Sequence, residues 1–243
     1  MALLRTEGIV LLAAEFGEKD RLVSFLTPER GVMRAVARGA RRPTSRLGPH
    51  LLPFSHCRLL LWEGKTLFGI SQAETISAHR RLRSDLRLFG EATLGAEVIL
   101  ACLPEGVPSH LSFRLFLRYL ELLEGGEEFS LFPFWRCQFL LKLLHALGHR
   151  PEFRRCLGCG RPPGEGRFLP AEGGVHCPSC SRGRGLPFPP SAGELGVRLL
   201  LSPALEERPD EGFPFLERAV MSLLESVIGR PLRAEVFLGI IEA

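Results

Sequence analysis

The sequence predicts an α+β protein with an N-terminal β-barrel, a helical remainder and an inserted metal-binding ribbon. Three observations predict it: strand-like segments fill the first eighty residues, helical periodicity begins after Ser77, and two Cys-x-x-Cys pairs interrupt the helical part. We expect a barrel at 1–80 and a helical domain at 81–243, with the ribbon inserted at 153–184. A chain of 243 residues is long enough to bury the cores of such domains.

Five N-terminal segments are short, rich in apolar and β-branched residues, and separated by turn residues. The expected strands are Leu3–Ala14, Arg21–Leu26, Gly31–Ala37, Arg58–Trp62 and Thr66–Ser71. Five strands with one long loop, at 39–53, favour a small Greek-key barrel of the oligonucleotide-binding type. An SH3-like barrel would give a similar pattern, so both alternatives stay open.

After Ser77, apolar residues recur at three- and four-residue steps, which indicates helices. The densest apolar face lies at Leu131–Leu147, and Gly148 ends that helix. Two further helices are expected at Ala192–Leu201 and Phe213–Ile228.

Two segments of the C-terminal half are expected to lie outside helices. Leu186–Pro190 is a Pro-rich linker, and Leu232–Leu238, after Gly229 and Pro231, is a short extended tail.

Four of the seven cysteines have the spacing of a zinc ribbon. Cys156 and Cys159 form one pair, and Cys177 and Cys180 form a second pair after seventeen intervening residues. Two such turns can present four thiolates to one Zn²⁺ ion in tetrahedral geometry. Four thiolates leave no open position for a substrate, so we expect a single structural Zn²⁺. Redox pairs or disulfides are the alternative, but neither pair opens a helix after a strand.

The other candidate metal ligand and the other thiols have simpler explanations. His176 could replace a sulfur ligand, although four thiolates already suffice. Cys57, Cys102 and Cys137 have apolar neighbours, so we expect buried free thiols.

The formal net charge of +4 hides an uneven distribution of cations. Arg30–Trp62 contains seven arginines and no acidic residue, and 154–184 contains six arginines and two acidic residues. Without local carboxylates, the guanidinium groups of the first region must bind water, distant acids or an external polyanion.

The third strand and the loop after it gather these arginines. Alternation along the strand directs Arg34 and Arg38 outward, and Gly39 opens the loop. The candidate nucleic-acid contacts are Arg34, Arg38, Arg41, Arg42 and Arg46. Arginine offers a bidentate fork to phosphate, so this array matches a nucleic-acid backbone. A solvated loop with arginines lying over apolar surface is the alternative.

No catalytic signature emerges, so we expect no enzyme activity and no nucleotide cofactor. Gly64-Lys65-Thr66 resembles the end of a phosphate-binding loop, but position 59 is Leu where that loop needs glycine. No apolar run approaches the roughly 18 residues that cross a bilayer. We therefore expect a cytoplasmic protein without a membrane partner.

These residues together resemble the bacterial RecO family of recombination mediators. The resemblance rests on Glu7–Val10, Gly17–Asp20 and the arginine loop from Ala37 to Arg46, together with the four cysteines and Ile228–Leu232. It runs from end to end, and the ordered combination is specific although each motif is short.

The resemblance implies an oligonucleotide-binding barrel, a helical domain and a zinc ribbon in a nucleoid-associated DNA repair protein. Such proteins bind single- and double-stranded DNA, anneal complementary strands without ATP, and act with RecR to load RecA onto DNA coated by single-strand binding protein. DNA contact then falls on Arg38, Arg41, Arg42 and Arg46, with Arg34 beside them, and zinc on the four cysteines. Some family members lack the cysteines, which argues against a central chemical role for zinc.

Two other functions stay open. A zinc-ribbon scaffold could dock acidic protein tails on its basic barrel, and an RNA-binding accessory protein would carry similar features.

Overall fold

The structure, a computed structural model, describes residues 3–126, 128–203 and 208–242. It forms two compact units, Met1–Gly125 with Leu232–Ala243 and Gly126–Pro231. The first unit contains the barrel and the helices that cover it, and the second contains the ribbon. The barrel and the helices that follow it thus belong to one compact unit. The domain boundary expected at residue 80 stays a prediction.

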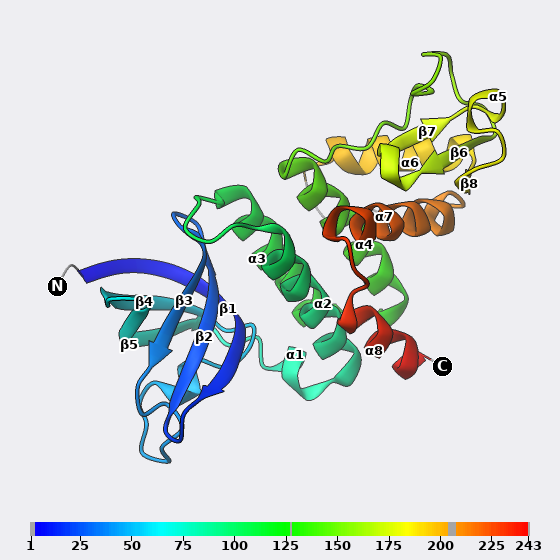
Figure 1. Cartoon of the computed structure of the whole chain (residues 1–243). Coiled ribbons are helices and arrows are strands. Elements are labelled where there is room, and N and C mark those ends of the chain that lie inside the picture. Colours follow the sequence, from blue (N-terminus) through cyan, green and yellow to red (C-terminus); the bar gives the residue numbers. More distant parts are fainter. Residues whose placement is uncertain (1–2, 127, 204–207, 243) are drawn as a thin grey trace. The chain divides into compact units, whose positions relative to one another are not determined.

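The N-terminal part of the first unit is a closed five-stranded barrel (Figure 1). Its strands are β1 (Leu3–Phe16), β2 (Asp20–Thr27), β3 (Gly31–Ala37), β4 (His56–Glu63) and β5 (Phe68–Ser77). They close in the order β1-β2-β3-β5-β4, and the β3–β5 pair is parallel whereas the other pairs are antiparallel. This confirms the expected oligonucleotide-binding barrel. A short 3₁₀ helix, η1 (Gly48–His50), lies in the long loop.

The register of β3 follows from its alternating side chains. Met33, Ala35 and Ala37 are buried in the barrel core, whereas Arg34 is exposed. A slip of one residue would turn the guanidinium inward and the apolar side chains outward, so burial fixes the register. Complete burial of a large core side chain such as Phe25 contributes about 1.5–3 kcal/mol.

Four helices complete the first unit, and carboxylates satisfy the free N–H groups at the starts of three of them. The helices are α1 (Arg81–Ser84), α2 (Leu86–Cys102), α3 (His110–Gly125) and α8 (Arg233–Glu242). Glu124 accepts the N–H groups of Arg81 and Leu82, and Asp85 accepts those at the start of α2. These contacts cap helices whose first N–H groups lack intrahelical partners.

The extended tail expected at Leu232–Leu238 is wrong, because this segment begins helix α8. Glu97 on α2 accepts the N–H groups of Arg233 and Ala234 and so caps the new helix. Leu238 is buried, and a Cβ on Gly90 of α2 would lie 2.6 Å from a Leu238 methyl carbon. Packing against α2 thus decides the conformation of the tail.

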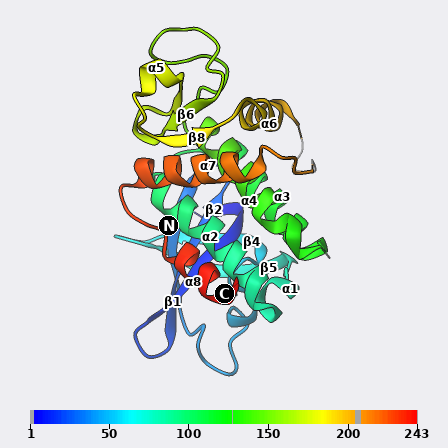
Figure 2. The same ribbon diagram turned by 90° about the vertical axis from the view of Figure 1, so that its right-hand side faces the viewer.

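The second unit combines three long helices with a small sheet (Figures 1 and 2). The helices are α4 (Phe132–Ala146), α6 (Pro190–Leu201) and α7 (Phe213–Ile228), and η2 (Phe129–Leu131) precedes them. The ribbon contains β6 (Gly166–Leu169), η3 (Pro170–Glu172), β7 (Gly174–His176), α5 (Pro178–Ser181) and β8 (Leu186–Phe188). The three expected long helices are confirmed to within two residues at each end. Every helix of the described residues is too short or too polar to span a membrane.

The Pro-rich linker expected at Leu186–Pro190 is wrong, because it contains β8, the edge strand of the β7-β6-β8 sheet. Proline is tolerated at an edge, where its missing N–H group breaks no ladder. Phe188 is buried and stacks on Phe153 at 5.5 Å between ring centroids, with Phe168 beside both. This aromatic cluster gives the ribbon a core that draws the segment into the sheet.

Candidate nucleic-acid interface and metal centre

The loop after β3 is an ordered turn. Gly39 has a φ of +66°, a left-handed conformation that favours glycine, and its N–H donates to Asp20 Oδ1 at 2.7 Å. The N–H of Arg41 donates to the carbonyl of Lys19 at 3.0 Å, which ties the loop to the β1–β2 turn. Ser45 Oγ accepts the N–H of Gly48 at 3.1 Å. The backbone therefore presents its arginines from fixed positions.

All five candidate arginines are exposed, but their partners differ. Arg34 pairs with Glu105 at 2.9 Å, and Arg41 pairs with Glu15 at 2.8 Å. Distant acids thus serve two of the arginines that lack local carboxylates. Exposed ion pairs of this kind are worth about 0–1 kcal/mol, so a polyanion can displace either carboxylate.

The other three arginines have no carboxylate partner within residues 3–126, 128–203 and 208–242. The guanidinium carbon of Arg38 lies over the Trp62 ring, 5.5 Å from its centroid. Arg42 is exposed in the loop, and Arg46 lines a groove of about 960 Å³. These three side chains are the ones most available to an external anion.

The five arginines do not share one groove. The Arg46 groove contains two other arginines and three glutamates, namely Arg5, Arg58, Glu7, Glu29 and Glu74. Arg38 lines a separate groove of about 690 Å³ beside Trp62. The barrel therefore offers cations on more than one part of its surface.

The four paired cysteines converge in the ribbon. Their sulfur atoms all lie within 4.8 Å of one another, and Cys159 Sγ lies 3.9 Å from Cys177 Sγ. Four sulfurs at 2.3 Å from a tetrahedral Zn²⁺ would lie about 3.8 Å apart. The cluster could therefore hold a metal ion, and its donor set and spacing fit Zn²⁺.

Backbone N–H groups prepare this cluster for thiolates. Burial disfavours the thiolate of Cys156, but N–H groups of Cys177, Cys159 and Gly158 outweigh burial and lower its pKa to about 6. The N–H of Cys177 lies 3.2 Å from Cys156 Sγ. Hydrogen bonds from Arg161 lower the pKa of Cys159. Hydrogen bonds to the other three sulfurs raise the pKa of Cys180 to about 12, so a cation is needed before all four ionise.

His176 and the other three thiols do not belong to this sulfur cluster. His176 is buried, with Nε2 2.9 Å from Glu172 Oε2, and it is not among the ligand atoms that converge in the described residues. Cys57 and Cys137 are buried as expected, and burial raises the pKa of each thiol. Cys102 is half-buried rather than buried.

Comparison with known proteins agrees with the barrel, the helices and the cysteine cluster. Residues 1–79 match the family model described as Recombination protein O N terminal, and residues 83–234 match Recombination protein O C terminal. The chain belongs to the RecO family. Both matches together cover most of its length, including the arginine loop and the ribbon.

Curated relatives named DNA repair protein RecO are similar over long stretches. The Rubrobacter xylanophilus protein is 38% identical over 240 residues, which cover 97% of this chain and 92% of the relative. The Symbiobacterium thermophilum protein is 40% identical over 185 residues, covering 74% and 72% of the two chains. An Anaeromyxobacter protein is 34% identical over 245 residues, covering 97% and 95%. This chain is thus a DNA repair protein of the RecO family.

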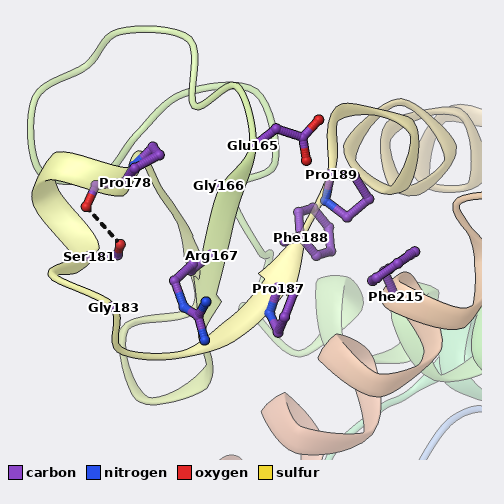
Figure 3. A pocket seen from close by; sticks show the side chains of 10 residues that line it. All are labelled: Glu165, Gly166, Arg167, Pro178, Ser181, Gly183, Pro187, Phe188, Pro189 and Phe215. Atoms are coloured by element: carbon purple, nitrogen blue, oxygen red, sulfur yellow. Dashed lines mark hydrogen bonds between the residues drawn. The ribbon is translucent and has the colours of Figure 1, made fainter.

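The ribbon arginines of this RecO-family chain differ in their availability. Arg167 donates to the carbonyls of Arg184 and Gly185, at 2.9 Å and 2.6 Å, and thereby holds the loop before β8. Figure 3 shows its side chain at a pocket of about 390 Å³ that Phe188 and Phe215 also line. Arg167 is therefore committed to the fold of the ribbon.

Other ribbon arginines are exposed, and their guanidinium groups have no carboxylate partner in the described part of the chain. They are Arg154, Arg155 and Arg182.

Sequence reasoning missed Trp62 and Glu105 as parts of the RecO barrel surface. Trp62 belongs to a strand pattern that gave no sign that its ring lies beside Arg38. Glu105 is distant in sequence from Arg34, so no local charge pattern could pair them.

Proposed function

We propose that this chain binds single- and double-stranded DNA through its barrel and anneals complementary strands without nucleotide hydrolysis. The observation that carries the proposal is the ordered loop with Arg38, Arg42 and Arg46 exposed and without carboxylate partners among the described residues. Arg34 and Arg41 join the binding surface when phosphates displace Glu105 and Glu15. The proposal includes the family's work with RecR in loading RecA onto DNA coated by single-strand binding protein.

Annealing requires partial neutralisation of two phosphate backbones and contacts weak enough to allow base pairing. Arginines lower the repulsion between approaching strands because they neutralise backbone phosphates, and the release of condensed counterions drives their binding. No covalent step is involved, and the protein acts as a non-enzymatic mediator. Zn²⁺ held by Cys156, Cys159, Cys177 and Cys180 would stabilise the ribbon and take no part in annealing.

Replacing Arg38, Arg41 and Arg42 together with Ala tests the proposal. We expect weaker binding to both single and double strands and a shallower salt dependence, by about one unit of slope per lost phosphate contact. Other exposed arginines of the same compact unit, Arg80, Arg114 and Arg233, provide a matched control of equal charge. Unchanged affinity and salt slope in the loop variant would contradict the proposal.

Annealing of complementary strands, with and without a coat of single-strand binding protein, measures the second part of the proposal. We expect faster annealing in the absence of ATP, and we expect the loop variant to lose this acceleration. A protein that binds DNA but never accelerates annealing would contradict this part.

A scaffold that docks acidic protein tails is the second candidate, because Arg34 and Arg41 already bind carboxylates. Competition between labelled DNA and an acidic peptide distinguishes the two functions. A parallel competition between RNA and DNA tests the third alternative, an RNA-binding accessory protein.

A further inference from the structure

A groove on the barrel carries a different chemistry from the arginine loop. It has a volume of about 690 Å³ and lies between the end of β1 and the β4–β5 hairpin. Three aromatic side chains line it, namely Phe16, Trp62 and Phe68. Phe16 is 46% exposed, so part of its ring is open to solvent at this groove.

The Trp62 ring packs against the sheet at a position where the neighbouring strand has a glycine and therefore no side chain. Trp62 on β4 pairs with Gly69 on β5, and Gly69 in turn pairs with Val36 on β3. A Cβ on Gly69 would lie 2.1–2.4 Å from three indole atoms, so the indole lies across the bare backbone. Glycine at this position lets the ring rest on the strand in a fixed orientation.

Arg38 places a positive charge beside the Trp62 ring in this groove. Its guanidinium carbon lies 5.5 Å from the Trp62 ring centroid, within the range of a cation–π contact. Both side chains line the same groove. The pair combines a π surface with a charge that can meet a phosphate.

The charge balance of the groove argues against a cradle for phosphates alone. Arg38 and Lys65 face two acids, Asp20 and Glu63, among the lining residues. Asp20 also accepts the N–H of Gly39 at 2.7 Å. With cations and acids equal in number, the aromatic surface is the distinguishing feature. Such a surface binds the exposed face of an unpaired base, which a duplex conceals inside its stack.

We propose that Trp62 is a stacking platform for an unpaired base of single-stranded DNA, with Arg38 contacting the adjoining phosphate. This inference rests on the proposed DNA binding by the barrel and adds a site that separates single strands from duplexes. The arginine loop binds the backbone of either form, whereas the Trp62 groove binds only a strand whose bases are free. One stacked base per groove is weakly held, so it can leave to pair with a complementary strand.

The chain contains two tryptophans, which permits a direct test. In a Trp135→Phe background, Trp62 is the only tryptophan and reports on its own contacts. We expect a single-stranded oligothymidylate to change its fluorescence strongly and a duplex of equal length to change it little. Anisotropy of labelled DNA measures total binding in parallel.

Variants of the platform supply the second measurement. Trp62→Ala should weaken oligothymidylate binding between about fivefold and about a hundredfold, the loss typical of one stacked base, and leave duplex binding unchanged. Trp62→Phe keeps an aromatic face and should restore most of the affinity. Gly69→Ala displaces the indole without removing it and should resemble Trp62→Ala. Duplex binding serves as the check that each variant is folded.

Two results would overturn the inference while the proposed function stands. One is oligothymidylate binding by anisotropy without any change in Trp62 fluorescence. The other is a folded Trp62→Ala protein with unchanged single-strand affinity. If neither DNA form binds the wild-type chain, both the inference and the proposed function fail. If Trp62→Ala does not fold, the fluorescence of the Trp135→Phe protein decides.

Discussion

The guanidinium of Arg34 lies 2.9 Å from the carboxylate of Glu105 at the surface of the barrel. Arg34 comes from β3, whereas Glu105 comes from the connection between α2 and α3. Both side chains are about half exposed, at 50% and 54%, so water screens their attraction. A phosphate that approaches Arg34 must therefore displace a weakly held carboxylate, which makes Glu105 a competitor for DNA.

Glu105→Gln should strengthen DNA binding by up to about fivefold, because DNA no longer has to break an ion pair worth about 0–1 kcal/mol to reach Arg34. Fluorescence anisotropy at fixed salt measures the change. The control is the same substitution in an Arg34→Ala background, where we expect almost no gain. An equal gain in both backgrounds would assign the effect to general loss of negative charge and contradict the pairing.

The sequence could predict the position of the arginines but not their partners. Alternation in β3 directed Arg34 and Arg38 outward, and the structure has both exposed. Their neighbours, Glu105 and Trp62, are brought to them by barrel closure and by the helices that follow. Tertiary contacts of this kind leave no periodic signal in one sequence.

Two segments were wrongly predicted for opposite reasons. The segment at 186–190 looked like a linker because prolines dominate it, yet buried Phe188 draws it into an edge strand. The tail after Gly229 and Pro231 was expected to be extended, yet Ala234 and Leu238, about one helical turn apart, are both buried. Spacing of apolar residues carried the correct signal in the second segment, and prolines hid it in the first.

The exposed ribbon arginines should contribute to annealing more than to binding of a single strand. We propose that the ribbon holds a second strand during annealing, and replacing Arg154, Arg155 and Arg182 with Ala removes three exposed cations from it. We expect slower annealing at unchanged zinc content, with nearly unchanged affinity of the barrel for one strand. Rates are measured by the quenching of labelled complementary strands.

The matched control for the ribbon replaces exposed arginines elsewhere in the same compact unit. Replacing Arg150, Arg208 and Arg218 with Ala removes the same number of charges from that unit. If the ribbon variant anneals DNA at the wild-type rate, the ribbon does not hold a strand. If both variants lose equal activity, net charge rather than the ribbon explains the effect.

One zinc ion per chain should depend on the paired cysteines. Cys177→Ser should abolish stable zinc binding, because it removes one of the four thiolates that hold the ion. The turn around Cys156, whose sulfur accepts the N–H of Cys177, then lacks the cation that balances its thiolates. Cys102→Ser, a half-buried cysteine outside the cluster, should keep the ion. A colorimetric zinc assay after thiol modification measures the stoichiometry.

Loss of zinc should also expose the ribbon to proteases. A chelator should speed cleavage within 153–188 while leaving the barrel intact. Acid should act in the same direction, because protons compete with the metal for the thiolates. Equal zinc content in the Cys177→Ser and Cys102→Ser proteins would contradict the proposed site.

His56 should make the stability of the barrel unit depend on pH. Its ring is buried beside Phe113, and Nε2 lies 3.2 Å from a carboxylate oxygen of Glu7. Burial lowers the pKa of His56 below the ordinary 6.5, although Glu7 and Glu121 partly oppose this and His79 adds to it. The folded state therefore favours the neutral ring. This stabilisation is complete above pH 6.5 and is lost as the pH falls through the lower pKa of the folded state.

The free energy of unfolding in urea, measured from pH about 8 to about 5, tests this dependence. His56→Gln lacks the titrating ring, so the advantage of the wild-type protein over this variant should shrink as the pH falls. Glu7→Gln removes the charge that stabilises the imidazolium of His56, so this variant should lose more unfolding free energy than the wild-type protein as the pH falls. His110→Gln, at an exposed position of α3, should follow the wild-type curve. Parallel curves for the wild-type and His56→Gln proteins would mean that the buried ring titrates alike in the folded and unfolded states.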